Sequence, residues 1–151
     1  MKVAKTEQGL ITYALGSCIG ICLYDSAARI AGMVHIMLPQ PSSTGKIDNI
    51  AKYATTGVPE LIKKMTAAGA SKVRLTAKIA GGAKMFAMNG GSSAIGEIGQ
   101  RNAEMVRQIL KQENIRLVGE DCGLDYARTM TFYRADGGAH IKSYGHGEKH
   151  F

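Results

Sequence analysis

Two apolar segments near the start of the chain, joined by a very short connection, constrain its fold most. Residues 9–24 are rich in β-branched side chains and are interrupted by Gly16 and Ser17, which predicts two strands that meet at a Gly–Ser corner. Residues 29–38 predict a further strand. The connection over residues 25–28 is short enough for an antiparallel pairing, so we expect the chain to begin as a sheet.

The remainder of the chain mixes helical and strand patterns. Helices are predicted over residues 49–68 and 100–113, and strands over residues 72–80, 115–119, 128–134 and 139–144. Gly57 and Pro59 predict a kink or a restart in the first helix. A terminal hairpin together with helical crossovers predicts an α+β layered sandwich, with a mixed β-sheet, helices packed on one side and a C-terminal β-hairpin. We expect residues 1–151 to form one domain, with residues 145–151 as a frayed tail.

The composition indicates an ordinary globular protein. Apolar residues make up 45% of the 151 positions and charged residues make up 21%. No apolar run approaches the roughly 20 residues that cross a bilayer. The first residues also lack the apolar core of a secretory signal. We therefore expect a cytoplasmic protein without membrane insertion.

The chain is basic, with 19 Lys and Arg against 12 acidic residues and a formal net charge of +7. This balance favours an anionic partner, such as nucleic acid, an acidic protein surface or lipid headgroups. The basic residues are scattered and the aromatic residues form no evident stacking platform, so a nucleic-acid function rests on charge alone. The favoured interpretation is a solvated basic surface that steers acidic partners.

The chain has three cysteines, Cys18, Cys22 and Cys122. They are few for this length and odd in number, which argues against a disulfide framework. Cys18 differs from the others because it follows the corner at Gly16 and precedes Gly20. A buried cysteine in a strand is often a small hydrophobic residue. The flanking glycines favour the alternative, in which the bend exposes Cys18 as a nucleophile.

The same corner predicts a place where an oxyanion could bind. A bend can leave successive backbone N–H groups free to face a developing negative charge, and Ser17 and Ile19 flank the thiol here. Gly81 and Gly82 open a glycine-rich loop that matches neither the phosphate-binding nor the dinucleotide fingerprint. That loop predicts either a close backbone approach to a substrate or simple packing.

His35 is the histidine nearest to Cys18 along the chain, on the strand predicted to pair with it. It shares a face with Met33 and Met37, which is also typical of a core histidine. A free thiol has a pKa near 8.5, so it needs a neighbouring imidazole to react at neutral pH. Paired with Cys18, His35 is therefore predicted to act as its general base.

A metal site is the natural rival for Cys18, Cys22 and His35. If residues 18–22 are extended, the two cysteine Cα atoms lie roughly 13 Å apart at about 3.3 Å per residue. Zinc–sulfur bonds of about 2.3 Å cannot bridge that span. No C-x-x-C pair is present either. We expect no metal and no cofactor in this reaction.

Four sequence blocks resemble the CheD family of chemoreceptor glutamine deamidases. They are residues 12–18 (TYALGSC), 35–39 (HIMLP), 78–86 (KIAGGAKMF) and 98–102 (IGQRN). Each block alone is weak, but the order and spacing match along nearly the whole chain.

The resemblance implies a catalytic Cys–His–Thr constellation at Cys18, His35 and Thr12, in a fold similar to bacterial toxin cysteine deamidases. It implies that the substrates are glutamine side chains on the cytoplasmic helical domain of chemoreceptors, with glutamyl methyl esters as second substrates. It also implies a CheC-type phosphatase as a possible partner. The alternatives are a non-catalytic chemotaxis adaptor that binds receptor or phosphatase, and a small nucleic-acid-binding domain.

Overall fold

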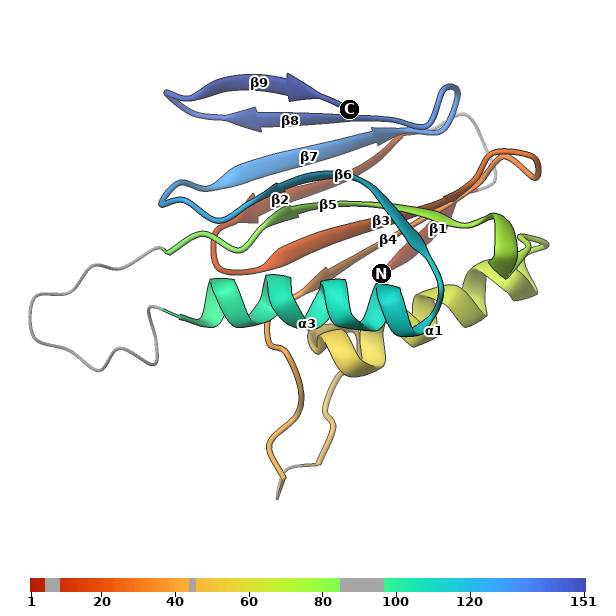
Figure 1. The fold of residues 1–151 in the computed structure, drawn as a ribbon, viewed down its shortest axis with the longest axis horizontal. Coiled ribbons are helices and arrows are strands. Elements are labelled where there is room, and N and C mark those ends of the chain that lie inside the picture. The colour runs from red at the N-terminus through yellow and green to blue at the C-terminus, as the bar shows by residue number, and fades with distance from the viewer. Residues whose placement is uncertain (5–8, 44–45, 85–96) are drawn as a thin grey trace, which may run out of the picture.

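The computed structural model describes residues 1–4, 9–43, 46–84 and 97–151, and it shows an α+β fold in three layers (Figure 1). The helices α1 (Ala54–Ala67) and α3 (Ile98–Gln112) form one outer layer. A mixed five-stranded sheet forms the middle layer, and a four-stranded antiparallel sheet forms the other outer layer. The predicted α+β class, with helices on one side, is confirmed.

The middle sheet has the strand order β1–β4–β3–β5–β6, and only β5 and β6 pair in parallel. The outer sheet has the order β2–β7–β8–β9. The bounds are β1 (Lys2–Ala4), β2 (Leu10–Leu15), β3 (Ile19–Asp25), β4 (Ile30–Ile36), β5 (Thr76–Gly81), β6 (Arg116–Cys122), β7 (Arg128–Tyr133), β8 (Gly138–Ser143) and β9 (Gly147–His150). The predicted hairpin of residues 128–134 and 139–144 is confirmed as β7 and β8.

The predicted mixed sheet is present, but the prediction did not include a second sheet, and the corner at Gly16 and Ser17 divides its two strands between the two. The strand before the corner, β2, pairs with β7 near the end of the chain. The strand after the corner, β3, lies between β4 and β5. An alternating apolar pattern fixes the faces of a strand but not its neighbours, so the second sheet could not be read from it.

The predicted alternation of faces in residues 29–38 is confirmed. Ile30, Val34 and Ile36 face the core between the helices and the middle sheet. Met33 faces a second core, between the two sheets. The strand β4 is therefore covered on both sides, and His35 lies on the side toward the outer sheet.

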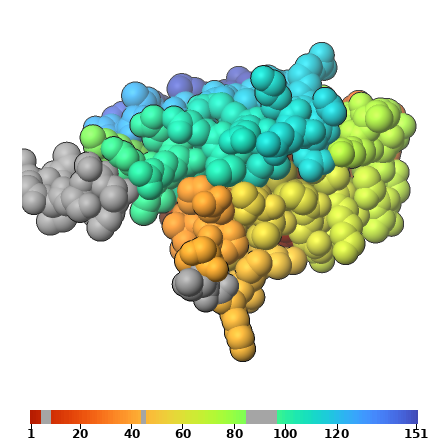
Figure 2. Space-filling view, turned by 60° about the horizontal axis from the view of Figure 1, so that its bottom comes forward, coloured from red at the N-terminus to blue at the C-terminus, as the bar shows by residue number. Residues whose placement is uncertain are grey.

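The restart of the first helix predicted at Gly57 and Pro59 is wrong, and the predicted helix of residues 49–68 is divided at Tyr53 instead. A short 3₁₀ turn over Ile50–Lys52 precedes Tyr53, and α1 then runs through Gly57 and Pro59. Figure 2 shows the helical layer with α1 beside α3 and the segment that leads into α1 projecting from it. In the described part of the chain, neither helix has the length and apolar character needed to cross a membrane.

The prediction that residues 145–151 form a frayed tail is wrong for the residues from Gly147 onward. They form β9, and Phe151 exchanges backbone hydrogen bonds of 2.7 and 3.0 Å with Ala139. The Lys78 ammonium donates to the Phe151 carbonyl at 2.7 Å. The Phe151 ring also fills the space that a side chain at position 119 would need, where the chain has Gly119. These tertiary contacts hold a segment whose own composition is that of a loop.

Candidate active site

Cys18 lies in the bend that carries the chain from β2 into β3. At the end of β2, the pairing with β7 shifts between Thr12 and Leu15, and Ala14 has a positive φ of 55°. A bulge of this kind bends a strand and changes the direction of the residues that follow. Cys18 is consequently placed just before β3, half-buried against the core between the two sheets.

Backbone hydrogen bonds from the end of β5 support this bend. The Gly82 N–H donates to the Cys18 carbonyl (2.8 Å), and the Ala83 N–H donates to the Gly16 carbonyl (2.7 Å). Gly81 has a φ of +118°, and a Cβ there would overlap the Cys18 carbonyl oxygen, so only glycine fits. Gly81 and Gly82 therefore hold the backbone of the bend, and in this state the Gly82 N–H is engaged there.

Asn102 of α3, for which the sequence predicted no role, supplies a second support. Its Nδ2 donates to the carbonyls of Ser17 and Met37, at 2.9 Å in both cases. The side chain is fully buried, with 0% exposure. Because Met37 directly follows β4, Asn102 links the bend that carries Cys18 to the strand that carries His35.

Two features of the sequence could have identified Asn102. It lies beside the apolar stripe of the predicted helix 100–113, where a buried polar side chain needs a partner. It also belongs to the block 98–102, in which Gly99 allows α3 to approach the backbone of Gly82 closely. A Cβ on Gly99 would lie 2.5 Å from the Gly82 carbonyl oxygen, so this block brings α3 against the support of the bend.

The carbonyl and N–H groups of the bend have different surroundings. The carbonyls of Gly16, Ser17 and Cys18 all accept the hydrogen bonds described above. Within the described ranges, the N–H groups of Ser17 and Cys18 donate to no backbone carbonyl. Such N–H groups beside a nucleophile can hold an oxyanion. The Ile19 side chain is fully buried in the helix-side core, so only its backbone could take part in binding an oxyanion.

His35 is held by Thr12, across the gap between the two sheets. The Thr12 Oγ1 atom lies 2.9 Å from His35 Nδ1. Gly20 lies opposite His35 in the β3–β4 ladder, and a Cβ on it would come within 2.9 Å of the Thr12 methyl group. The absence of a side chain at Gly20 therefore allows Thr12 to reach the imidazole.

Strand register places Cys18 and His35 on the same face. Gly20 pairs directly with His35, and Cys18 precedes Gly20 by two residues, so all three face the outer sheet. Cys18 and the Thr12–His35 pair therefore lie on the same side of the middle sheet.

Burial favours the neutral forms of both groups. It raises the pKa of the Cys18 thiol, and the N–H of Cys18 itself opposes this effect. Burial and, secondarily, the charge of the N-terminal amine lower the pKa of His35. At neutral pH the resting pair is therefore a thiol and a neutral imidazole.

A neutral imidazole has one donor and one acceptor nitrogen. When Nδ1–H of His35 donates to Thr12 Oγ1, the lone pair of Nε2 is left to accept a proton. In this tautomer Nε2 can accept a proton, and the contact with Thr12 Oγ1 orients the ring.

The two other cysteines are poorer nucleophiles. Cys22 is almost completely buried in β3, and this burial raises its pKa strongly. Burial raises the pKa of Cys122 to about 12. A thiol must ionise to react, so Cys18 is the best candidate of the three.

Among the described residues, one cavity lies beside the edge strand β1 and another lies beyond the ends of β5 and β6. One of about 270 Å³ is beside the Thr12–His35 pair and is lined by Met1, Lys2, Leu10, Ile11, Thr12, Met33 and His35. A larger one, of about 350 Å³, lies between α3 and the residues after β6, and its lining includes Cys122 but neither Cys18 nor His35. Cys18 lines neither cavity, but the smaller one is lined by both Thr12 and His35.

Comparison with known proteins agrees with the residues assembled above. Residues 37–143 match the model of the family described as "CheD chemotactic sensory transduction". This match begins after Thr12, Cys18 and His35, so it covers the supporting residue Asn102 but not the proposed reacting groups.

Full-length relatives cover the remainder. A protein of Caldanaerobacter subterraneus is 45% identical over 149 residues, which is 99% of this chain and 91% of the relative. A protein of Syntrophomonas wolfei is 45% identical over 148 residues (98% and 91%), and one of Lachnoclostridium phytofermentans is 40% identical over 149 residues (99% and 92%). Each is named "Probable chemoreceptor glutamine deamidase CheD".

Proposed function

This chain belongs to the CheD family of chemoreceptor glutamine deamidases, and we propose that it hydrolyses glutamine side-chain amides with Cys18 as nucleophile, His35 as base and Thr12 as the group that orients the base. The observation that carries the proposal is the 2.9 Å contact between Thr12 Oγ1 and His35 Nδ1, on the face that Cys18 shares. It leaves the second imidazole nitrogen available to the thiol.

The first half of the reaction forms a thioester. His35 Nε2 takes the Cys18 proton as the sulfur attacks the carboxamide carbon of glutamine. The oxygen of the tetrahedral intermediate is then negative, and the N–H groups of Ser17 and Cys18 are the donors available to it. A donor of this kind contributes about 3 kcal/mol. Protonated His35 gives its proton to the departing nitrogen, and ammonia leaves.

The second half repeats these roles with water. Neutral His35 removes a proton from water, and the resulting hydroxide attacks the thioester carbon. The Cys18 thiolate leaves and recovers the proton, so the net change is amide plus water to acid plus ammonia. A thiol attacks esters more readily than amides, so glutamyl methyl esters are proposed as second substrates.

The proposed substrate is the cytoplasmic helical domain of chemoreceptors, which places the reaction in the cytoplasm. Apolar side chains around the site are unusually exposed: Ile11 and Tyr13 on β2 are 47% and 63% exposed, and Met37 after β4 is 51% exposed. The net charge of +7 favours an acidic partner. We also propose a CheC-type phosphatase as a second partner, which would compete with the receptor for the same surface. We further propose that the fold is similar to that of bacterial toxin cysteine deamidases.

Ammonia release from a purified receptor cytoplasmic domain tests the assignment. Cys18→Ala should abolish release while circular dichroism shows a preserved fold. Cys122→Ala, a matched change at a less reactive cysteine, should retain most of it. If Cys18→Ala still releases ammonia, Cys18 is not the nucleophile. If the wild-type protein and both variants bind the receptor but none of them releases ammonia, a non-catalytic adaptor is the better description.

A further inference from the structure

The hairpin of β8 and β9 carries a second cluster of reactive side chains, which takes no part in the proposed deamidation. His140 on β8 lies opposite His150 on β9 in the strand register. Their rings are stacked, with centroids 4.2 Å apart and an interplanar angle of 11°. Glu148 approaches the same place, with its Oε2 atom 2.9 Å from His140 Nε2. One nitrogen or oxygen atom from each of the three lies within 4.8 Å of the others.

The cluster is on the solvent side of the outer sheet. Ala139 and Ile141, which flank His140 in β8, face the core between the sheets. Side chains alternate along a strand, so His140 faces away from that core. Glu148 and His150 are exposed and His140 is half-buried, so a solute can reach all three.

The strand that supplies two of the three residues is held in place by other contacts. Phe151 closes the ladder with Ala139 through two backbone hydrogen bonds. Lys149 donates to the Asp121 carboxylate at 2.6 Å. The backbone positions of His140, Glu148 and His150 are therefore set by the paired strands before anything binds to the side chains.

From this geometry we propose that His140, Glu148 and His150 bind a divalent transition-metal ion, of which Zn²⁺ is the best fit. Two imidazole nitrogens and one carboxylate oxygen are a ligand set that suits zinc and its neighbours, whereas Ca²⁺ and Mg²⁺ prefer oxygen ligands alone. Three protein ligands leave a position for water. The ion would join β9 to β8 and stabilise the end of the chain.

One basic residue limits the affinity of the proposed site. The Lys142 ammonium is 3.3 Å from Glu148 Oε1, while His140 contacts the other oxygen, Oε2. An entering ion competes with Lys142 for the Glu148 carboxylate. Lys142→Gln is accordingly expected to tighten metal binding.

The test uses the full chain carrying Cys18→Ala, so that the thiol of the proposed active site cannot bind metal. Zn²⁺ is titrated by calorimetry, and imidazole resonances are followed by NMR. We expect one saturable equivalent, with shifts confined to the rings of His140 and His150. His150→Gln and Glu148→Gln should each weaken binding by about tenfold or more.

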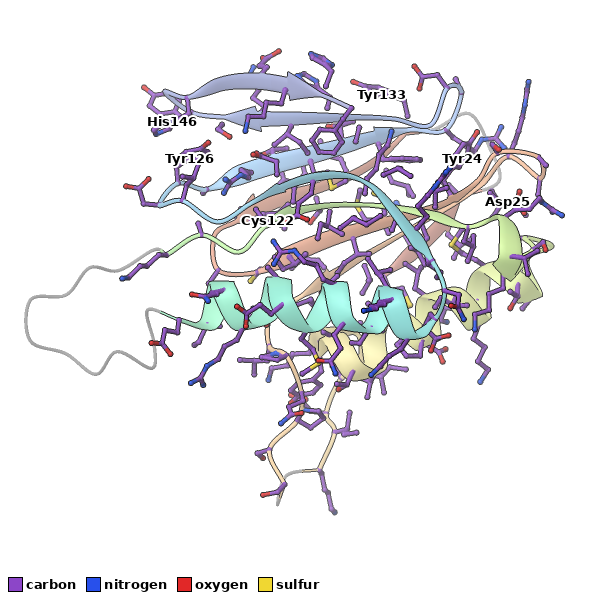
Figure 3. The ribbon with its side chains drawn as sticks, viewed as in Figure 1. Tyr24, Asp25, Cys122, Tyr126, Tyr133 and His146 are labelled. Atoms are coloured by element: carbon purple, nitrogen blue, oxygen red, sulfur yellow. The ribbon has the colours of Figure 1, made fainter. Side chains whose placement is uncertain are left out.

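His146→Gln is the matched control, because this histidine lies in the same hairpin but stacks on Tyr126, 3.9 Å between ring centroids (Figure 3). It should leave binding unchanged. The proposal is overturned if Zn²⁺ does not saturate one site, or if binding survives both His150→Gln and Glu148→Gln. Circular dichroism distinguishes loss of ligands from loss of fold, and the two single variants on β9 provide independent measurements.

Discussion

Replacement of Asn102 by alanine should loosen the bend that carries Cys18. The change removes two hydrogen bonds of 2.9 Å, to the carbonyls of Ser17 and Met37. Each such bond contributes about 0.5–1.5 kcal/mol net, so the two together contribute about 1–3 kcal/mol. The buried Oδ1 atom of Asn102 has no partner in the described structure, and its removal offsets part of that loss. We expect the free energy of unfolding to fall by about 1–2 kcal/mol, which lowers the melting temperature by about 2–8 °C.

The effect of Asn102→Ala on catalysis should exceed its effect on stability. Without the link, the Cys18 bend and the end of β4 can move relative to one another, and small displacements of reacting groups cost about tenfold to a hundredfold in rate. Asn102 is 0% exposed and cannot touch a substrate, so the loss should appear in kcat and leave KM nearly unchanged. Ammonia release from a receptor fragment measures both constants, and thermal melting measures stability.

Gln108→Ala is the control for this variant, because it removes a side-chain amide from the exposed face of the same helix. Gln108→Ala should keep wild-type kcat and melting temperature. An Asn102→Ala protein that melts earlier but retains wild-type kcat would show that Asn102 supports the fold alone. A protein unchanged in both respects would refute the two hydrogen bonds.

Three further outcomes follow from the same structure. Gly81→Ala should lower the free energy of unfolding by more than about 2 kcal/mol, because the new Cβ would overlap the Cys18 carbonyl at a positive φ. Gly123→Ala, where φ is +86° and the space is open, should lower it by only about 1 kcal/mol. Equal melting temperatures for the two variants would contradict this. Since burial lowers the pKa of His35 from its ordinary 6.5, the imidazole should stay neutral and active in mildly acidic solution, and kcat/KM should fall only below pH 6.5. A fall in kcat/KM that begins above pH 6.5 as the solution is acidified would contradict this. The same shift removes stability as the pH falls, because the unfolded chain binds that proton more tightly. Deletion of residues 147–151 should lower the melting temperature by about 5 °C or more, and an unchanged value would show that β9 is not docked.

The part of the fold that depends on local pattern could be predicted from the sequence. The alternation in residues 29–38 correctly placed Val34 and Ile36 on one face of the strand and Met33 on the other. The pairing of β3 with β4 followed from their short connection. In both cases the information lies within a few residues of the element it determines.

The part that depends on distant contacts could not. The pairing of β2 with β7 joins residues more than a hundred positions apart, for example Thr12 and Met130. The docking of β9 depends on Phe151 meeting Gly119, and no composition-based argument detects that contact. The cluster of His140, Glu148 and His150 was missed for the same reason, because His140 and His150 meet only once β9 has formed.

The candidate site shows the same division. The glycine corner pointed to Cys18, and the predicted pairing of strands pointed to His35. The role of Thr12 came from a family resemblance, since a threonine on a strand has no chemical signature of its own. Asn102 was visible only as a polar residue beside an apolar stripe, and its two carbonyl partners required the structure.

A double-substitution cycle on the base and the hydroxyl that holds it tests the central claim most directly. His35→Gln should lower kcat for ammonia release by about 10²- to 10⁴-fold, and Thr12→Val by less. If Thr12 acts only through the His35 ring, the double variant will be no slower than His35→Gln alone. Multiplicative losses, or a His35→Gln protein with wild-type kcat, would contradict the account.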